Sequence, residues 1–374
     1  MQTTTYKHKK GSIIYTMIIL AVIMMSVYFT NIQSKAAINT KLDLSQKQLL
    51  LLSNYLYFED TDKLIPIQDK LDSMKSNNKY DPELINSPAS GIKDSKAIEM
   101  FKEIESDEVL SNLVAVDSID ANIRIVAFVD KNCVGVKDAE AVVVFQGTKG
   151  LDAPWLDNLQ GATEVETSMQ LEAGAFFSKV EKTYNVSYVT GHSKGGNLAQ
   201  YVTITHSDNI RKCVSFDGQG FSKYFISKYK TQITENANKI TNICSYKEPV
   251  HALLTPIASK VLLIKTDDKV DSLSSHVSSL LYEKRFFDKN GAYLSTCLTK
   301  PTKIVNTVEK LSDYVTENVS EDTFENASEK ITPLLGYIMP LMQDTIAHED
   351  MNVLEALYTE YKETKTANAK NATN

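Results

Sequence analysis

The chain has 374 residues, enough for one large α/β domain with extensions. Apolar residues make up 43% and charged residues 23%, as in an ordinary globular protein, and the net charge of −7 argues against nucleic acid as a general partner. The four cysteines, Cys133, Cys213, Cys244 and Cys297, lack C-x-x-C spacing, so we expect buried free thiols and not a metal site. The sequence implies no metal or organic cofactor for the protein.

The N-terminus carries a hydrophobic segment. Ile13 to Phe29 contains no charge, follows the basic run YKHKK and could cross most of a bilayer as a helix. The tripeptide SKA at 34–36 has small residues at the spacing of a signal-peptidase site. We therefore expect residues 1–36 to be a signal peptide or a signal anchor. The body would then lie outside the cytoplasm, either secreted or membrane-anchored.

Residues 37–94 are predicted to form an N-terminal extension of helix and loops. The run LDLSQKQLLLLSNYLYFED indicates a helix from about Ser45, with leucines on a broad face. The following residues are rich in Asp, Lys, Asn, Ser and Pro, which favours loops and short helices.

Residues 95–295 are predicted to form the α/β core. Helical patterns alternate with the strand-like runs IRIVAFVD, AEAVVVFQG, VSYVT, KCVSFDG, ITNICSY and KVLLIKT. This alternation predicts a mostly parallel sheet with right-handed crossovers. Residues 296–365 are predicted to be a helical C-terminal region, with Pro340 kinking one helix, and residues 366–374 a disordered tail.

The stretch YVTGHSKGGNLAQYV contains a G-x-S-x-G motif between a strand-like run and a helical pattern. Glycine on both sides of Ser193 permits a sharp strand-to-helix turn that leaves the serine at its apex. The context favours a nucleophilic serine over an incidental serine in a glycine-rich turn.

A nucleophilic serine needs a base, and the usual triad order in this motif's fold places that base after the serine. His192 adjoins Ser193 and points elsewhere, and His206 falls at the far end of the elbow helix. Between His251 and His276, we favour His276 because it follows the last strand-like run in a polar loop.

Two carboxylates are candidates for the acid that orients the base. Asp217 ends the strand in CVSFD, and Glu248 follows the next strand, NICSYKE. Both would emerge at the edge of the sheet that carries Ser193, so position alone leaves the choice open. The strand ending in VVVFQGTKG places the amide of Thr148, and its hydroxyl, where they could pair with the amide of Lys194 as oxyanion donors.

The strings VVVFQGTKG, WLDNLQ and VTGHSKGGNLAQYV resemble the fungal-type lipase pattern. GHSKGGNLA, SFDGQGF and SSHVSSLLYE together are closer still to a bacterial lipase-like family whose substrates are largely undefined. The resemblance covers about residues 95–285 and implies an α/β-hydrolase fold, with Ser193 as nucleophile, His276 as base, and Thr148 and Lys194 as oxyanion donors.

The resemblance also bears on the acid. The FDG-x-GF segment of the bacterial group favours Asp217 narrowly, whereas KEPVHAL echoes the acid segment of fungal-type lipases and points to Glu248. Gln146 stands where an arginine is usual, so the local ion pairing is expected to differ.

These features predict a serine hydrolase of carboxylic esters, with lipid acyl esters as the favoured substrates. One alternative is a catalytically silent hydrolase-fold module that binds at a membrane surface. The other is a thioesterase or peptidase that uses the same site.

Overall fold

The structure is a computed structural model that describes residues 39–58, 63–76, 94–121, 123–148, 161–206, 208–267, 269–270 and 274–318. The described residues from Lys41 onward belong to one compact unit. The expected membrane segment, the SKA site, the WLDNLQ string, Pro340 and the tail all lie outside the described residues. Within the described part of the chain, no helix combines the length and hydropathy needed to cross a bilayer.

A seven-stranded sheet forms the centre of the fold, and its strands lie side by side in their sequence order. The strands are β1 (Leu113–Asp120), β2 (Arg124–Asp130), β3 (Glu140–Phe145), β4 (Asn185–His192), β5 (Lys212–Phe216), β6 (Ile240–Ser245) and β7 (Lys260–Ile264). β1, β2 and β3 pair antiparallel, whereas β3 to β7 are parallel. The sheet is therefore mixed and mostly parallel, in agreement with the predicted α/β class.

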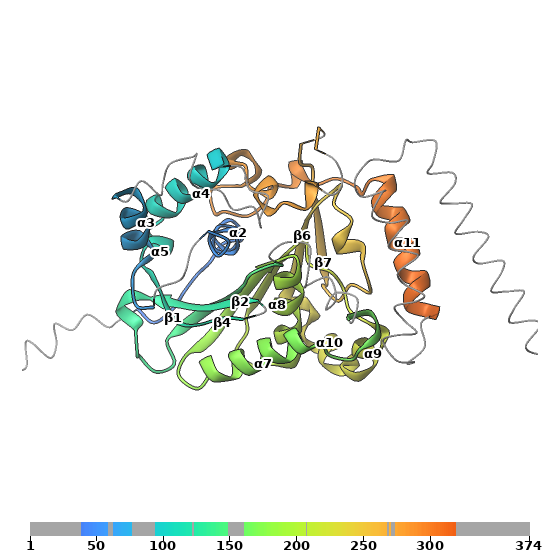
Figure 1. The fold of residues 1–374 in the computed structure, drawn as a ribbon, viewed down its shortest axis with the longest axis horizontal. Coiled ribbons are helices and arrows are strands. Elements are labelled where there is room, and N and C mark those ends of the chain that lie inside the picture. Colours follow the sequence, from blue (N-terminus) through green and yellow to red (C-terminus); the bar gives the residue numbers. More distant parts are fainter. Residues whose placement is uncertain are drawn as a thin grey trace, which may run out of the picture. The chain divides into compact units, whose positions relative to one another are not determined.

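The helices cover both faces of the sheet. They are α2 (Gln46–Tyr55), α3 (Ile67–Ser76), α4 (Asp94–Ser106), α5 (Glu108–Ser111), α7 (Ser168–Val180), α8 (Lys194–Thr205), α9 (Lys223–Lys228), α10 (Lys230–Asn236) and α11 (Lys303–Asn318). Figure 1 shows α2 to α5 on one side of the sheet and α7 to α10 on the other. Successive crossovers of one hand between strands in sequence order put their helices on the same face, so the N-terminal helices cover the opposite one.

Alternation along the strands divides the core into two layers. Val142 and Val144 of β3 pack in a cluster with the leucines of α2, whereas Val143 and Phe145 pack with α7 and α8. Leu49 to Leu52 are fully buried in the first cluster. The helix expected from about Ser45 therefore forms part of the core, and Ser45 caps it through a capping box with Gln48.

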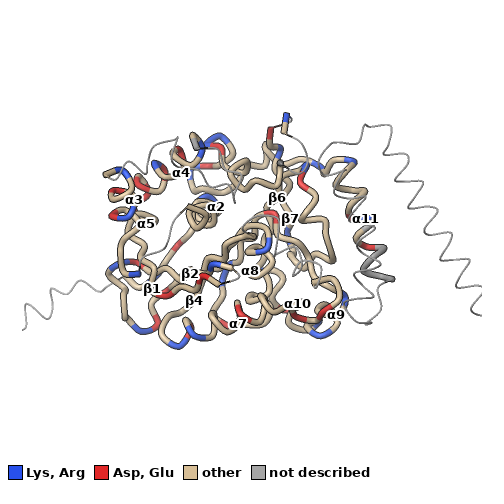
Figure 2. The backbone as a smooth tube through the Cα atoms, in the orientation of Figure 1, with Lys and Arg blue, Asp and Glu red and all other residues tan. Residues whose placement is uncertain are grey.

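The structure differs from the sequence interpretation in two local details. The edge strand β1 was not anticipated, and the helical segment expected between the runs KCVSFDG and ITNICSY is divided at Tyr229 into α9 and α10. The four cysteines are buried free thiols, as expected. Figure 2 shows positions of basic and acidic residues interspersed along the described backbone.

Candidate active site

The turn between β4 and α8 holds Ser193 in an unusual backbone conformation. β4 ends at His192, α8 begins at Lys194, and Ser193 between them has φ 57° and ψ −122°. The Ser193 N–H donates to the carbonyl of Phe216 at 2.8 Å, which fixes the turn against β5. A non-glycine residue with positive φ is costly and clusters at functional sites. The sharp turn expected from G-x-S-x-G is therefore present.

Gly195 allows the start of α8 to pack directly on the end of β3. A Cβ at this position would lie 2.1 Å from the carbonyl oxygen of Phe145, an impossible contact with backbone. Because β3 and β4 are parallel neighbours, with Phe145 opposite Gly191, the end of β3 lies next to the turn that carries Ser193.

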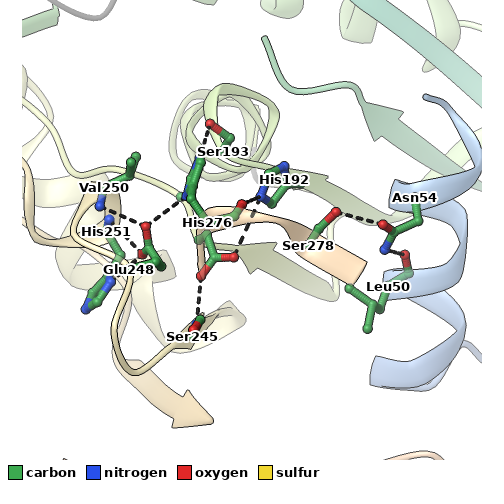
Figure 3. A network of polar contacts seen from close by, with 12 residues as sticks. Leu50, Asn54, His192, Ser193, Ser245, Glu248, Val250, His251, His276 and Ser278 are labelled. Atoms are coloured by element: carbon green, nitrogen blue, oxygen red, sulfur yellow. Dashed lines mark hydrogen bonds and ion pairs between the residues drawn. The ribbon is translucent and has the colours of Figure 1, made fainter. Parts of the chain in front are cut away.

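His276 lies against the serine. Its Nε2 is 2.8 Å from Ser193 Oγ, although 83 residues separate the two in sequence (Figure 3). The imidazole belongs to a short 3₁₀ turn, Ser274–His276, after β7, as the polar loop position predicted. Of the other downstream histidines that the structure describes, His206 caps the end of α8, and His251 lies on the far side of Glu248 from His276.

Glu248 lies against the opposite edge of the His276 ring. Its Oε2 is 2.8 Å from His276 Nδ1, and its Oε1 makes a very short contact with Nδ1 of His251. The N–H of Val250 donates to Oε2 at 2.8 Å, and that of His251 to Oε1 at 3.0 Å. Four donors thus surround a fully buried carboxylate.

These donors hold Glu248 in its charged form. Burial alone would raise the pKa of the Glu248 carboxyl, but the two imidazoles, His251 foremost, hold it below its ordinary value. A carboxylate accepts hydrogen bonds and donates none, so Nδ1 of His276 carries its proton toward Glu248. In the neutral ring Nε2 is then an acceptor for the Ser193 hydroxyl. This is the protonation state that a general base needs before attack.

Asp217 lies in the same region without joining this arrangement. Its Oδ1 accepts the Ser245 N–H at 2.8 Å, and Oδ2 has no hydrogen-bond partner among the described residues. Burial and the negative charge of Glu248 raise the pKa of the Asp217 carboxyl well above its ordinary range. The geometry therefore corrects the narrow preference for Asp217: its backbone, at φ 50°, turns the carboxylate toward β6, and Glu248 contacts the imidazole.

The assignment of Lys194 and Thr148 as oxyanion donors stays a prediction. Lys194 is the first residue of α8, where N–H groups have no intrahelical acceptor. Thr148 follows β3, and its buried Oγ1 has no hydrogen-bond partner within the described residues. Gln146, at the position where an arginine was expected, donates instead through Nε2 to the carbonyl of Leu56 at 2.7 Å.

Among the described residues, two clusters have the composition of metal ligands, but both ring nitrogens of His276 and both carboxylate oxygens of Glu248 already make hydrogen bonds. His192, Asp217 and His276 place one ligand atom each within 4.8 Å of the others, as do Cys244, Glu248 and His251. Glu248 accepts four hydrogen bonds, and burial raises the pKa of the Cys244 thiol, which disfavours the thiolate that metals bind. We assign no metal to either cluster.

The serine, imidazole and carboxylate come from three elements at one edge of the parallel sheet, in the chain order Ser, Glu, His. A family model described as Mbeg1-like matches residues 110–325, more than half of the chain. The chain belongs to the Mbeg1-like family. This family is lipase-like, which agrees with the α/β architecture and suggests a lipase-like hydrolase. A comparison with curated proteins found no match. All three residues of the Ser193, Glu248 and His276 arrangement lie within the part of this Mbeg1-like chain that the family model covers.

Proposed function

We propose that the protein is a serine hydrolase of carboxylic esters, with Ser193 as nucleophile, His276 as general base and Glu248 as the acid that orients it. The observation that carries the proposal is the continuous contact chain, with 2.8 Å from Ser193 Oγ to His276 Nε2 and 2.8 Å from His276 Nδ1 to Glu248 Oε2. Nucleophile, base and orienting group within hydrogen-bond reach are the signature of covalent acyl transfer.

In the proposed reaction, Ser193 Oγ attacks the ester carbonyl carbon while its proton passes to Nε2 of His276. The buried charge of Glu248 stabilises the imidazolium that forms. When the tetrahedral intermediate collapses, the bond to the leaving alcohol breaks and His276 returns the proton to the departing oxygen. Water then attacks the acyl-enzyme by the same proton route and releases the acid.

The negative oxygen of the intermediate would accept hydrogen bonds from the backbone N–H groups of Lys194 and Thr148. The Thr148 hydroxyl, buried and unpaired among the described residues, is a third donor for the same oxygen. One such donor is typically worth ~2.7–4 kcal/mol of transition-state stabilisation.

Lipid acyl esters are the favoured substrate class. Two observations support them: the family is lipase-like, and the sequence predicts a membrane segment at Ile13–Phe29 that would hold the domain near a lipid surface. We propose the same extracytoplasmic location that this segment predicts.

The proposal is tested by covalent labelling with a fluorophosphonate probe and by turnover of acyl esters of graded chain length, with and without detergent micelles. Wild type should label at Ser193 and hydrolyse esters, and Ser193→Ala should do neither. Preference for long chains presented in micelles would support lipid, and equal turnover of short soluble esters would restrict the function to an esterase.

Ser53→Ala provides a matched control. Ser53 is also fully buried, and its hydroxyl has no hydrogen-bond partner in the described structure, so its removal should leave labelling unchanged. A folded wild type that resists the probe and hydrolyses no ester or thioester would overturn the proposal in favour of a silent binding module.

A further inference from the structure

The C-terminal end of α2 lies against the candidate active site. Asn54 lies in the last turn of α2 (Gln46–Tyr55), and Tyr57 lies in the turn that directly follows the helix. Neither lies within residues 110–325 that the family model covers. Both nevertheless reach the segment that carries His276, through separate hydrogen bonds.

The first connection runs from Tyr57 through His192 to His276. The Tyr57 hydroxyl is 2.8 Å from His192 Nδ1, and His192 Nε2 is 2.8 Å from the backbone carbonyl oxygen of His276. A carbonyl only accepts, so Nε2 of His192 carries the proton and Nδ1 accepts from the tyrosine. Burial lowers the pKa of His192 to about 3, which keeps the ring in the neutral form that this relay requires.

The second connection joins Asn54 to Ser278. The Ser278 hydroxyl donates to Asn54 Oδ1 at 2.7 Å, and Asn54 Nδ2 donates to the carbonyl of Leu50 at 2.9 Å (Figure 3). Asn54 is 1% exposed and Ser278 likewise. The peptide that bears the imidazole is thus held at His276 and again two residues later.

The same end of α2 also contacts the strand end that leads to Thr148. The Gly147 N–H donates to the Tyr57 hydroxyl, and the carbonyl of Leu56 accepts from Gln146 Nε2 at 2.7 Å. A Cβ at Gly147 would lie 2.1 Å from that hydroxyl, so glycine makes room for the tyrosine. Tyr57 therefore touches both the proposed oxyanion strand and the residue that supports the His276 backbone.

We infer that Tyr57 and Asn54 are positioning residues that hold the His276 segment in register with Ser193, through His192 and Ser278 respectively. The inference rests on the proposed hydrolase function. Its physical basis is that His276 is the last residue of a single 3₁₀ turn. Such a short turn cannot hold the imidazole ring in a fixed position without support from outside. A displacement of about 1 Å in a catalytic group can cost on the order of 100-fold in rate.

The experiment compares Tyr57→Phe and Asn54→Ala with wild type in ester turnover and in the rate of fluorophosphonate labelling. We expect kcat and the labelling rate to fall about 10-fold to 100-fold in each variant, with KM nearly unchanged, because the substrate is not contacted. The double variant Ser278→Ala, Asn54→Ala should lose no more kcat than Asn54→Ala alone, because both substitutions remove the same hydrogen bond between Ser278 and Asn54.

Two matched controls separate positioning from a general loss of packing. In Tyr184→Phe the lost hydroxyl accepts the Gly135 N–H at 2.8 Å, remote from Ser193, and in Asn236→Ala the lost amide donates to the carbonyl four residues earlier, as Asn54 does. Both controls should lose as much thermal stability as Tyr57→Phe and Asn54→Ala, but keep the wild-type kcat.

A readout independent of turnover is the ¹⁵N resonance pair of His192. In wild type the proton should reside on Nε2, and Tyr57→Phe should shift the Nδ1 resonance because its donor is gone. Wild-type kcat and labelling rate in folded Tyr57→Phe and Asn54→Ala would overturn the inference. A folded wild type that neither labels nor hydrolyses esters or thioesters would instead refute the proposed function.

Discussion

The carboxylate of Glu248 lies between two imidazoles, 2.8 Å from Nδ1 of His276 and in very short contact with Nδ1 of His251. Asp217, at the end of the neighbouring strand, is equally buried and shares no hydrogen bond with either ring among the described contacts. The difference between these two carboxylates leads to the first three predictions.

Glu248→Gln should nearly abolish turnover, and Asp217→Asn should not. The amide of glutamine cannot hold His276 in the tautomer that presents Nε2 to Ser193, and loss of the carboxylate in a related triad lowers kcat by about 10⁴-fold. Asparagine at 217 keeps the oxygen that accepts from Ser245 and tolerates the positive φ. The measurement is kcat on a soluble ester. Inactive Asp217→Asn beside active Glu248→Gln would reverse our assignment.

Asp217→Asn should also gain stability over wild type as pH rises above 4. The folded pKa of Asp217 is raised above the ordinary 3.8, so the folded state holds a proton that the unfolded chain releases. This group therefore favours folding most at low pH, and its contribution falls by up to ~1.4 kcal/mol per pH unit until the folded pKa is reached. Urea unfolding at pH 4, 6 and 8 measures the effect. A constant difference between the variants would mean that Asp217 ionises in the folded protein.

His251→Ala should shift the acidic limb of the kcat/KM profile. His251 is foremost among the groups that lower the pKa of Glu248, so its removal raises that pKa and lets the carboxyl accept a proton at higher pH. We expect activity below pH 6 to fall more than activity at pH 8. His206→Ala serves as the control, because His206 contacts Thr205 at the far end of α8. Parallel profiles for wild type and His251→Ala would contradict the prediction.

Ser193→Gly should be more stable than Ser193→Ala, and both should be inactive. With φ 57° and ψ −122° the backbone at 193 favours glycine, whereas a Cβ costs about 1–3 kcal/mol there. Part of this gain is offset by the greater freedom of glycine in the unfolded chain, roughly 0.5–1 kcal/mol. Thermal melts of the two variants provide the comparison, and equal melting temperatures would show that the turn stores no strain at this residue.

The elbow and the histidine that contacts Ser193 could be predicted because their signals are local. Glycines flank Ser193 between a strand and a helix, and His276 is a polar-loop histidine after the last strand. The choice between Asp217 and Glu248 could not be made in the same way, since both follow parallel strands that end at one edge. Side-chain direction decides it, and direction depends on the turn after each strand.

The contacts between the end of α2 and the His276 segment also could not be predicted from local sequence patterns. The sequence indicates a leucine-rich helix from about Ser45, and nothing near Asn54 or Tyr57 points to a histidine more than 200 residues later. The edge strand β1 was missed for a different reason: in LVAVDSID the apolar run ends halfway, where the strand becomes only partly buried.

The order of the strands has a consequence for how this molecule assembles. Each strand pairs with the strand that precedes it in the sequence, so the sheet can form strand by strand during synthesis, from β1 to β7. The hydrogen bond between Asn54 and Ser278 instead closes a loop of 224 residues. Ester turnover should consequently be the last property gained on refolding and the first lost on mild denaturation, while most of the sheet persists.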